Sequence, residues 1–159
     1  MQNARTLRWA RPILLGAALV LSGLAAAPPA FADKPPVYTA PFSRVAVGGY
    51  DPVAYFTDGR PVRGASEHSL TYQGYEYRFA SAAHLAAFRA DPARYLPRYG
   101  GYCAWAAAQG RTASGDPRYW RIVDGRLYLN YNAEIQQRWE RDIPGFIRAA
   151  DANWPGLLR

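Results

Sequence analysis

Two hairpin signals constrain the fold more than any other feature of the sequence. The stronger is Asp124-Gly125, which lies between two strand-like runs within 119–130. Asp-Gly suits a type I′ turn, whose two central residues both need a positive φ angle. The second signal is Gln73-Gly74, within 68–79, where aromatic residues alternate with polar ones. Each signal predicts an antiparallel hairpin with one face turned toward a core.

Helix-start signals separate and follow these hairpins. Ser81, Asp91 and Asn132 each precede a run that suits a helix, and their side chains can accept a hydrogen bond from a backbone N–H of the first turn. Proline stands at the first helical position after Asp91 and near it after Asp142. We expect helices over 81–90, from 92, over 102–109, over 132–141 and over 142–153, and an extended or strand segment over 51–56. The predicted fold class is therefore α+β, a single domain of small antiparallel β-hairpins packed with short helices.

The beginning of the chain has the pattern of an export signal. Three arginines precede an apolar run over 13–27, and Ala30-Phe31-Ala32 offers the small residues that a signal peptidase recognises. We expect residues 1–32 to be a signal peptide that is cleaved after Ala32, with an uncleaved anchor as the alternative. Cleavage predicts a periplasmic or secreted protein with no stable membrane anchor.

The remaining chain divides into a proline-rich leader and one domain. Proline fixes φ and lacks a backbone donor, so residues 33–44 are expected to form an extended leader, followed by the domain over 45–157. The formal net charge is +7 without any run of basic residues, which argues against nucleic acid as a partner. No glycine-rich phosphate loop is present, so no nucleotide cofactor is expected.

Cys103 is the only cysteine, and it follows Gly100-Gly101 at the expected start of a helix. Unpaired N–H groups at a helix start favour a thiolate, so Cys103 is a candidate redox thiol. The alternative is a small buried residue packed between Tyr102 and Trp105. Gly100, Gly101, Tyr102 and Trp105 are the predicted ligand-binding residues, and for the glycine pair the alternative is a tight backbone turn.

The two histidines, His68 and His84, are the other candidates for chemistry. Either could supply a nitrogen to a metal or exchange a proton with the thiol, and the alternative for both is a surface residue. His84, His68 and Cys103 are the predicted metal ligands, with Cu or Zn as the transition metal considered. Asp51, before Pro52, is expected to organise a turn.

Several of these segments together resemble a known family. The stretches 51–56 and 72–81, with Phe88, Asp91-Pro92 and Tyr95, resemble the YHS domain family. The longer pattern through 99–104, 122–130 and Trp139 to Trp154-Pro155 is similar to the exported bacterial branch of that family, in which selenocysteine can occupy the position of Cys103.

The resemblance implies a small α+β unit related to zinc-binding treble-clef folds, and an association with metal handling. Metal-type members carry cysteine at the positions of Ala54 and Ala80 and near that of His84. A thiolate zinc site needs about four soft or borderline ligands, so these replacements weaken the metal interpretation. The cysteine retained at position 103 points instead to redox chemistry.

The sequence therefore predicts an exported YHS-domain protein that uses its lone cysteine for thiol-based redox chemistry or soft-metal handling. The partner would be an oxidant, a partner thiol or a soft metal such as Cu(I). A non-catalytic periplasmic module that binds a small ligand or a protein is the alternative. With one cysteine in the chain, oxidation could give only a sulfenic acid or a mixed disulfide.

Overall fold

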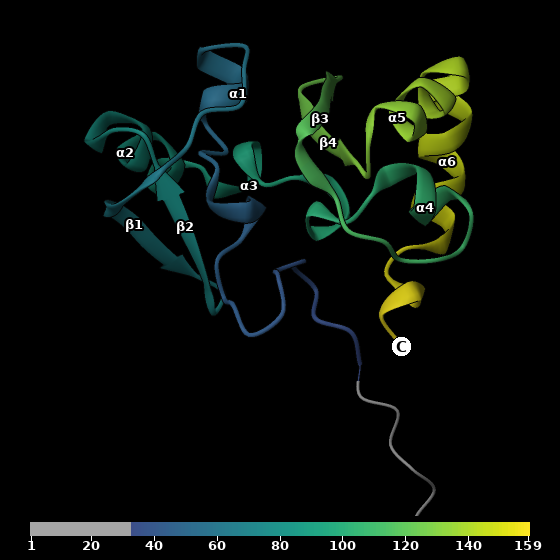
Figure 1. Ribbon diagram of the computed structural model, residues 1–159, viewed down its shortest axis with the longest axis horizontal. Coiled ribbons are helices and arrows are strands. Elements are labelled where there is room, and N and C mark those ends of the chain that lie inside the picture. Colours follow the sequence, from purple (N-terminus) through teal and green to yellow (C-terminus); the bar gives the residue numbers. More distant parts are fainter. Residues whose placement is uncertain (1–32) are drawn as a thin grey trace, which may run out of the picture. The chain divides into compact units, whose positions relative to one another are not determined.

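The computed structural model describes residues 33–159 (Figure 1). The predicted signal peptide, residues 1–32, lies outside this range. Within 33–159 no helix combines the length and the apolar character that crossing a membrane requires.

Both predicted hairpins form. β1 (Ala65–Tyr72) pairs with β2 (Tyr75–Phe79), and β3 (Asp116–Val123) pairs with β4 (Arg126–Asn130), each pair antiparallel and each a separate two-stranded sheet. At the stronger turn, Asp124 and Gly125 have φ angles of 49° and 70°, as a type I′ turn requires. Short helices surround the hairpins, so the α+β fold class is confirmed.

Three helices begin at the predicted capping residues Ser81, Asp91 and Asn132. Ser81 Oγ accepts a hydrogen bond from His84 N at 3.2 Å, and Asn132 Oδ1 accepts one from Ile135 N at 2.8 Å. Asp91 and Asp142 cap in the same way. The α-helices are α1 (Ala54–Thr57), α2 (Ala82–Ala90), α3 (Pro92–Tyr95), α4 (Ala104–Ala108), α5 (Ala133–Trp139) and α6 (Ile143–Asn153). Four 3₁₀ turns complete the elements: η1 (Val47–Gly49), η2 (Arg98–Gly101), η3 (Glu140–Asp142) and η4 (Gly156–Leu158).

Two local expectations were wrong. The segment 51–56 was expected to be extended, but its second half begins α1, because Asp51 Oδ1 accepts hydrogen bonds from Val53 N at 2.8 Å and Ala54 N at 3.4 Å and so starts a turn. The helix expected over 102–109 is α4, which starts later. Cys103 is its N-cap residue, with an extended backbone, and does not lie in its first turn.

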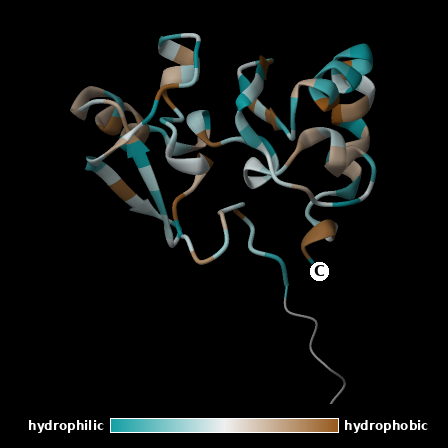
Figure 2. Ribbon diagram, viewed as in Figure 1, coloured by the Kyte–Doolittle hydropathy of each residue, from teal (hydrophilic) through white to brown (hydrophobic). Residues whose placement is uncertain are grey.

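The apolar side chains form two clusters, and β4 contributes to both. Leu127 and Leu129 join the cluster that contains Phe79 and Phe88, whereas Tyr128 joins the cluster around Trp139. This division follows from the alternation of side chains along a strand. Figure 2 shows apolar residues in η4 at the C-terminus, and Leu157 and Leu158 of this turn pack on the second cluster.

The proline-rich leader is held against the domain, and it is not extended throughout, because the chain turns at Pro41 and Phe42. Tyr38 N donates to Gly100 O at 2.9 Å, and the Tyr102 hydroxyl donates to Pro35 O at 2.9 Å. Gly100 has a φ of 60°, and a Cβ at this position would collide with the carbonyl of Pro36. The glycine therefore serves both the turn and the close approach of the leader.

Candidate functional site

Cys103 is buried in the part of the chain that holds β3 and β4, where it forms a parallel bridge with Leu129. The residue is 1% exposed and its N–H donates to Ala113 O at 2.9 Å. As the N-cap of α4 it directly follows the turn η2. The candidate thiol is thus buried. The backbone of Cys103 is fixed by its hydrogen bond to Ala113 and by its place between η2 and α4.

The surroundings of the sulfur act on its pKa in opposite directions. Burial is the largest influence and raises the pKa of the Cys103 thiol, because a thiolate loses hydration there. The backbone N–H groups of Ala106, Tyr131 and Trp105, and the charge of Arg111, lower the pKa by a smaller total. The resting group is therefore a neutral thiol, with donors already arranged around the place where a negative charge would form.

Asn130 is the residue next to the sulfur that the sequence did not indicate. Its side chain is fully buried at the end of β4, and its Oδ1 lies 3.7 Å from Cys103 Sγ and 3.3 Å from Trp105 N, both of which donate to it. If the O and N of the Asn130 amide were exchanged, its NH₂ group would face the N–H of Trp105, and two donors would oppose each other. The contacts therefore support the orientation in which Oδ1 faces Trp105 N and Cys103 Sγ. Nδ2 has no partner among the described residues.

A pocket of about 300 Å³ adjoins the sulfur. Besides Cys103 its lining residues are Trp105, Ala106, Arg111, Ala113, Tyr131 and Ile135. The wall is thus largely apolar, with Arg111 as its one charged side chain, and the guanidinium lies 5.4 Å from the centre of the Trp105 ring. The buried Cys103 thus lies in the wall of a pocket that has room for a small molecule.

The predicted ligand-binding residues divide into two groups. Trp105 lines the pocket with Cys103, as expected for a ligand contact. Gly100, Gly101 and Tyr102 contact other parts of the chain instead: the leader covers Gly100, the carbonyl of Gly101 packs against Gly115, and the hydroxyl of Tyr102 bonds to the leader. Ligand binding by these three residues stays a prediction.

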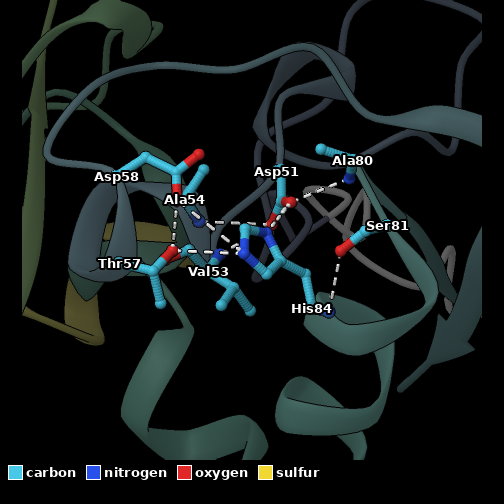
Figure 3. A network of polar contacts seen from close by, with 8 residues as sticks. All are labelled: Asp51, Val53, Ala54, Thr57, Asp58, Ala80, Ser81 and His84. Atoms are coloured by element: carbon cyan, nitrogen blue, oxygen red, sulfur yellow. Dashed lines mark hydrogen bonds and ion pairs between the residues drawn. The ribbon is translucent and has the colours of Figure 1, made fainter.

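His84 belongs to a different cluster, centred on Asp51 (Figure 3). Asp51 is fully buried, and its Oδ2 accepts hydrogen bonds from His84 Nδ1 at 2.6 Å and from Ala80 N at 2.8 Å. Its Oδ1 accepts the two N–H groups that begin α1. Asp51 thus organises a turn, as predicted, and also connects α1, β2 and α2.

The other ring nitrogen of His84 points away from Asp51. Nε2 lies 3.3 Å from Thr57 Oγ1 and 3.8 Å from Asp58 Oδ1, and the Thr57 hydroxyl donates to Asp58 Oδ1 at 2.7 Å. Figure 3 shows Thr57 and Asp58 on the same side of the imidazole. The side chains of His84 and Asp58 are 19% and 32% exposed, so this side of the cluster is open to solvent.

The three predicted metal ligands are not brought together. His84 lies in α2, His68 in β1, and Cys103 at the start of α4, on the other side of Figure 1 from α2. Among residues 33–159 no three His, Cys, Asp or Glu side chains gather in a way that could hold a metal ion. A shared site for these three residues therefore has no support in the described geometry.

A second, larger hollow of about 750 Å³ lies beside the thiol pocket. Its walls include Tyr38, Tyr50, Tyr119 and Tyr131, with Arg63 stacked on Tyr50 at 4.3 Å from the ring centre. Tyr131 is 52% exposed and also lines the thiol pocket, so the two hollows share a wall.

Comparison with protein-family models gives one match. Residues 53–99 match the YHS domain. This segment runs from the start of α1 into η2, so it includes His84 and ends shortly before Cys103. Neither curated proteins nor solved structures yield a match to the chain.

The YHS domain is associated with metal handling, so its cysteine positions can be compared with the structure. Ala54 N, Ala80 N and His84 Nδ1, at the three positions where the resemblance implies cysteine, all donate to the carboxylate of Asp51. The two alanines have no side chain that could bind a metal. The third residue, His84, uses its Nδ1 to bond the buried carboxylate of Asp51. These residues do not fit a thiolate metal site.

Proposed function

We propose that this YHS-domain protein is exported and that Cys103 is its functional group, a thiol that reacts reversibly with a small oxidant. The observation that carries the proposal is the position of Cys103 in the wall of a pocket of about 300 Å³ that Arg111 also lines, where the charge of Arg111 and nearby backbone N–H groups lower the pKa of the thiol against the effect of burial. Such donors stabilise a thiolate or an oxygen bound to sulfur once the neutral resting thiol reacts.

The reaction that we infer is the reduction of a hydroperoxide. The thiol loses its proton and the sulfur attacks one peroxide oxygen, so that an S–O bond forms as the O–O bond breaks. The leaving oxygen takes up a proton, giving the Cys103 sulfenic acid and either water or an alcohol. The chain has no second cysteine, so one external thiol must displace water to form a mixed disulfide, and another must release Cys103 from it.

The pocket supports oxidant chemistry better than binding of a soft metal. Its lining residues include no histidine, methionine, carboxylate or second cysteine, so Cys103 would be the single soft ligand that it offers. Cu(I) favours soft thiolate and thioether ligands and would need further ones from outside the pocket.

The test is chemical labelling of the folded protein without residues 1–32. We expect a small neutral alkylating reagent to modify Cys103 without denaturant, and brief hydrogen peroxide treatment to give a sulfenic acid that a dimedone-type probe traps, read by mass spectrometry. The Cys103→Ser variant is the control and should give neither product. Labelling that requires denaturation would contradict the proposal.

Export is tested separately. Expression in a Gram-negative host, followed by fractionation and sequencing of the protein N-terminus, should give a periplasmic product that begins at Asp33. A product that retains residues 1–32 in the membrane fraction would support the uncleaved anchor instead.

A non-catalytic binding module is the second candidate, and the larger hollow favours it. Its lining residues include four tyrosines, which suit a ligand that stacks on aromatic rings. In that case Cys103→Ser would leave ligand binding unchanged, whereas Tyr131→Ala, at the wall shared by both hollows, would weaken it.

A further inference from the structure

We propose that the side-chain amide of Asn130 is a positioning group for Cys103 and that it rotates when the sulfur becomes anionic. In the thiol state Oδ1 accepts the S–H. In the thiolate or sulfenate state Nδ2 takes its place and donates to the sulfur or to the oxygen bound to it. The inference rests on the proposed thiol function, because it names a residue that favours the charged forms of Cys103.

The place of Asn130 is set by the backbone around it. It is the last residue of β4, and the residue before it, Leu129, forms a parallel bridge with Cys103. The residue after it, Tyr131, contributes one of the backbone N–H groups that lower the pKa of the thiol. The end of β4 therefore runs along the sulfur, and the Asn130 side chain is fully buried there.

In the resting thiol state one atom of the amide has two partners and the other has none. Oδ1 accepts hydrogen bonds from Cys103 Sγ at 3.7 Å and from Trp105 N at 3.3 Å. Nδ2 is buried and has no acceptor within 33–159. Buried amide donors are rarely left unpaired, because their loss of hydration is then uncompensated. Asn130 thus has an unused donor beside a group that becomes a strong acceptor when it ionises.

Loss of the thiol proton reverses the preference of the amide. A thiolate that faced Oδ1 would place a negative charge against a carbonyl oxygen, with no hydrogen between them. The O and N of an amide are nearly equal in size and shape. Half a turn about the Cβ–Cγ bond therefore brings Nδ2 to the present place of Oδ1, about 3.7 Å from Sγ and within reach of a hydrogen bond to sulfur.

The Trp105 N–H has a second acceptor available after this rotation. It is one of the three backbone groups that lower the pKa of Cys103, so it lies close to the sulfur as well as to Oδ1. When Oδ1 turns away, this N–H can donate to the anionic sulfur group. One amide atom lacks a partner in either state, Nδ2 before the rotation and Oδ1 after it. The gain is that hydrogen bonds to a charged group replace a bond from the weak S–H donor.

The other groups around the sulfur act in a different way. Arg111, which follows α4, is the one charged side chain in the pocket wall, and Tyr131 is the one titratable side chain there besides Cys103. No carboxylate lines this pocket. Arg111 favours the anion by its charge, whereas Asn130 favours it by a directed bond, so variants can separate the two contributions.

The first test is the pH dependence of Cys103 alkylation in the folded Asn130→Ala protein. A hydrogen bond to a charged group is about twice as strong as a neutral one, so the loss of Nδ2 should outweigh the loss of Oδ1. We expect half-maximal alkylation at a higher pH than in the unaltered protein, and a rate at neutral pH that is about tenfold lower, which corresponds to one unit of pKa. If Asn130 served only as an acceptor for the thiol, the variant would react faster at neutral pH, and the proposal would be wrong.

Asn153→Ala is the matched control. Asn153 Nδ2 donates to Ala107 O at 2.9 Å and to Ala108 O at 3.3 Å, at the other end of α4 from Cys103. This variant loses asparagine bonds to the same helix without altering the surroundings of the sulfur, so it should keep the unaltered pH profile. An equal alkaline change in both variants would assign the effect to α4 as a whole and would overturn the proposal.

The second test observes the amide without any substitution. A second molecule of hydrogen peroxide oxidises the sulfenic acid to a sulfinic acid and is itself reduced to water, and the sulfinate is anionic at neutral pH. Nuclear Overhauser spectra should show a strong contact between the Asn130 NH₂ protons and the Trp105 N–H in the sulfinate form, and a weak or absent one in the thiol form.

The outcomes separate this proposal from the thiol function. The same Asn130 contacts in both forms would overturn the rotation and leave the thiol function standing. A Cys103 that neither peroxide nor the alkylating reagent modifies in the folded protein would overturn both.

Discussion

The surroundings of Asp51 and of Cys103 show two ways of burying a group that can carry negative charge. The Asp51 carboxylate accepts hydrogen bonds from three backbone N–H groups and one imidazole, so both of its oxygens are occupied. The Cys103 sulfur has three N–H groups nearby but keeps a raised pKa, and the adjacent Asn130 Nδ2 has no partner among the described residues. The first arrangement fixes structure, whereas the second leaves donors free for a charge that arises only on reaction.

The comparison also separates the two groups in space. The side chain of His84 is 19% exposed, whereas Cys103 is 1% exposed and lines a pocket. The match to the YHS domain includes His84, but it begins after Asp51 and stops before Cys103. Variants in one region should therefore leave the chemistry of the other intact.

The largest expected effect is on chemical labelling, in which Cys103→Ser and His84→Ala should differ completely. Cys103→Ser should lose all alkylation and sulfenic acid formation, whereas His84→Ala should keep both. Mass spectrometry of the two labelled proteins measures this. Loss of labelling in His84→Ala would show that the two regions act as one site.

Asp51→Ala should cost the most stability. It removes the acceptor for three backbone N–H groups and for His84, and each buried donor left without a partner costs about 1–3 kcal/mol. We expect a decrease of about 3 kcal/mol or more in the free energy of unfolding, measured by urea denaturation. A decrease below about 1 kcal/mol would mean that water replaces the carboxylate.

Asn130→Ala should destabilise the protein less than Asp51→Ala. It leaves Trp105 N and the Cys103 thiol without their shared acceptor but also removes an unpartnered donor, so we expect a loss of about 1–2 kcal/mol. Urea denaturation of both variants ranks the two regions. A loss as large as that of Asp51→Ala would contradict the contrast between them.

The smallest expected effect is on the pH dependence of labelling. Burial raises the pKa of Cys103, so the thiolate fraction and the alkylation rate should increase with pH and reach half-maximum above the pH found for a free cysteine. Arg111→Gln removes a charge that lowers the pKa, so its profile should move further toward alkaline pH. An exposed arginine paired elsewhere, Arg138, offers the matched control as Arg138→Gln. Half-maximal labelling below the pH of free cysteine would contradict this account.

Local signals made much of the fold predictable. Asp124-Gly125 and Gln73-Gly74 specify hairpins through the φ angles that their turns need, and Ser81 and Asn132 specify helix starts through bonds to N–H groups three residues away. The error at 51–56 was also local, because the Asx turn of Asp51 was recognised but its continuation as α1 was not.

The candidate sites were predictable only in part. The sequence indicated Cys103 and His84 by residue type, but their partners lie 27 and 33 positions away, at Asn130 and Asp51. No spacing rule connects residues so far apart in different elements. The signal that was available for Asn130 was a polar residue at the end of a strand with otherwise apolar and aromatic neighbours.

The sequence by itself determined where the chain turns, where its helices start and which residues can react, because these depend on bonds and φ angles within a few positions. Only the tertiary structure decided what each reactive group meets. Packing of η2, α4 and β4 buried the sulfur beside a pocket, and docking of α1 against α2 set His84 between two carboxylates. Burial and distant charges govern reactivity, and both arise only when separate elements come together.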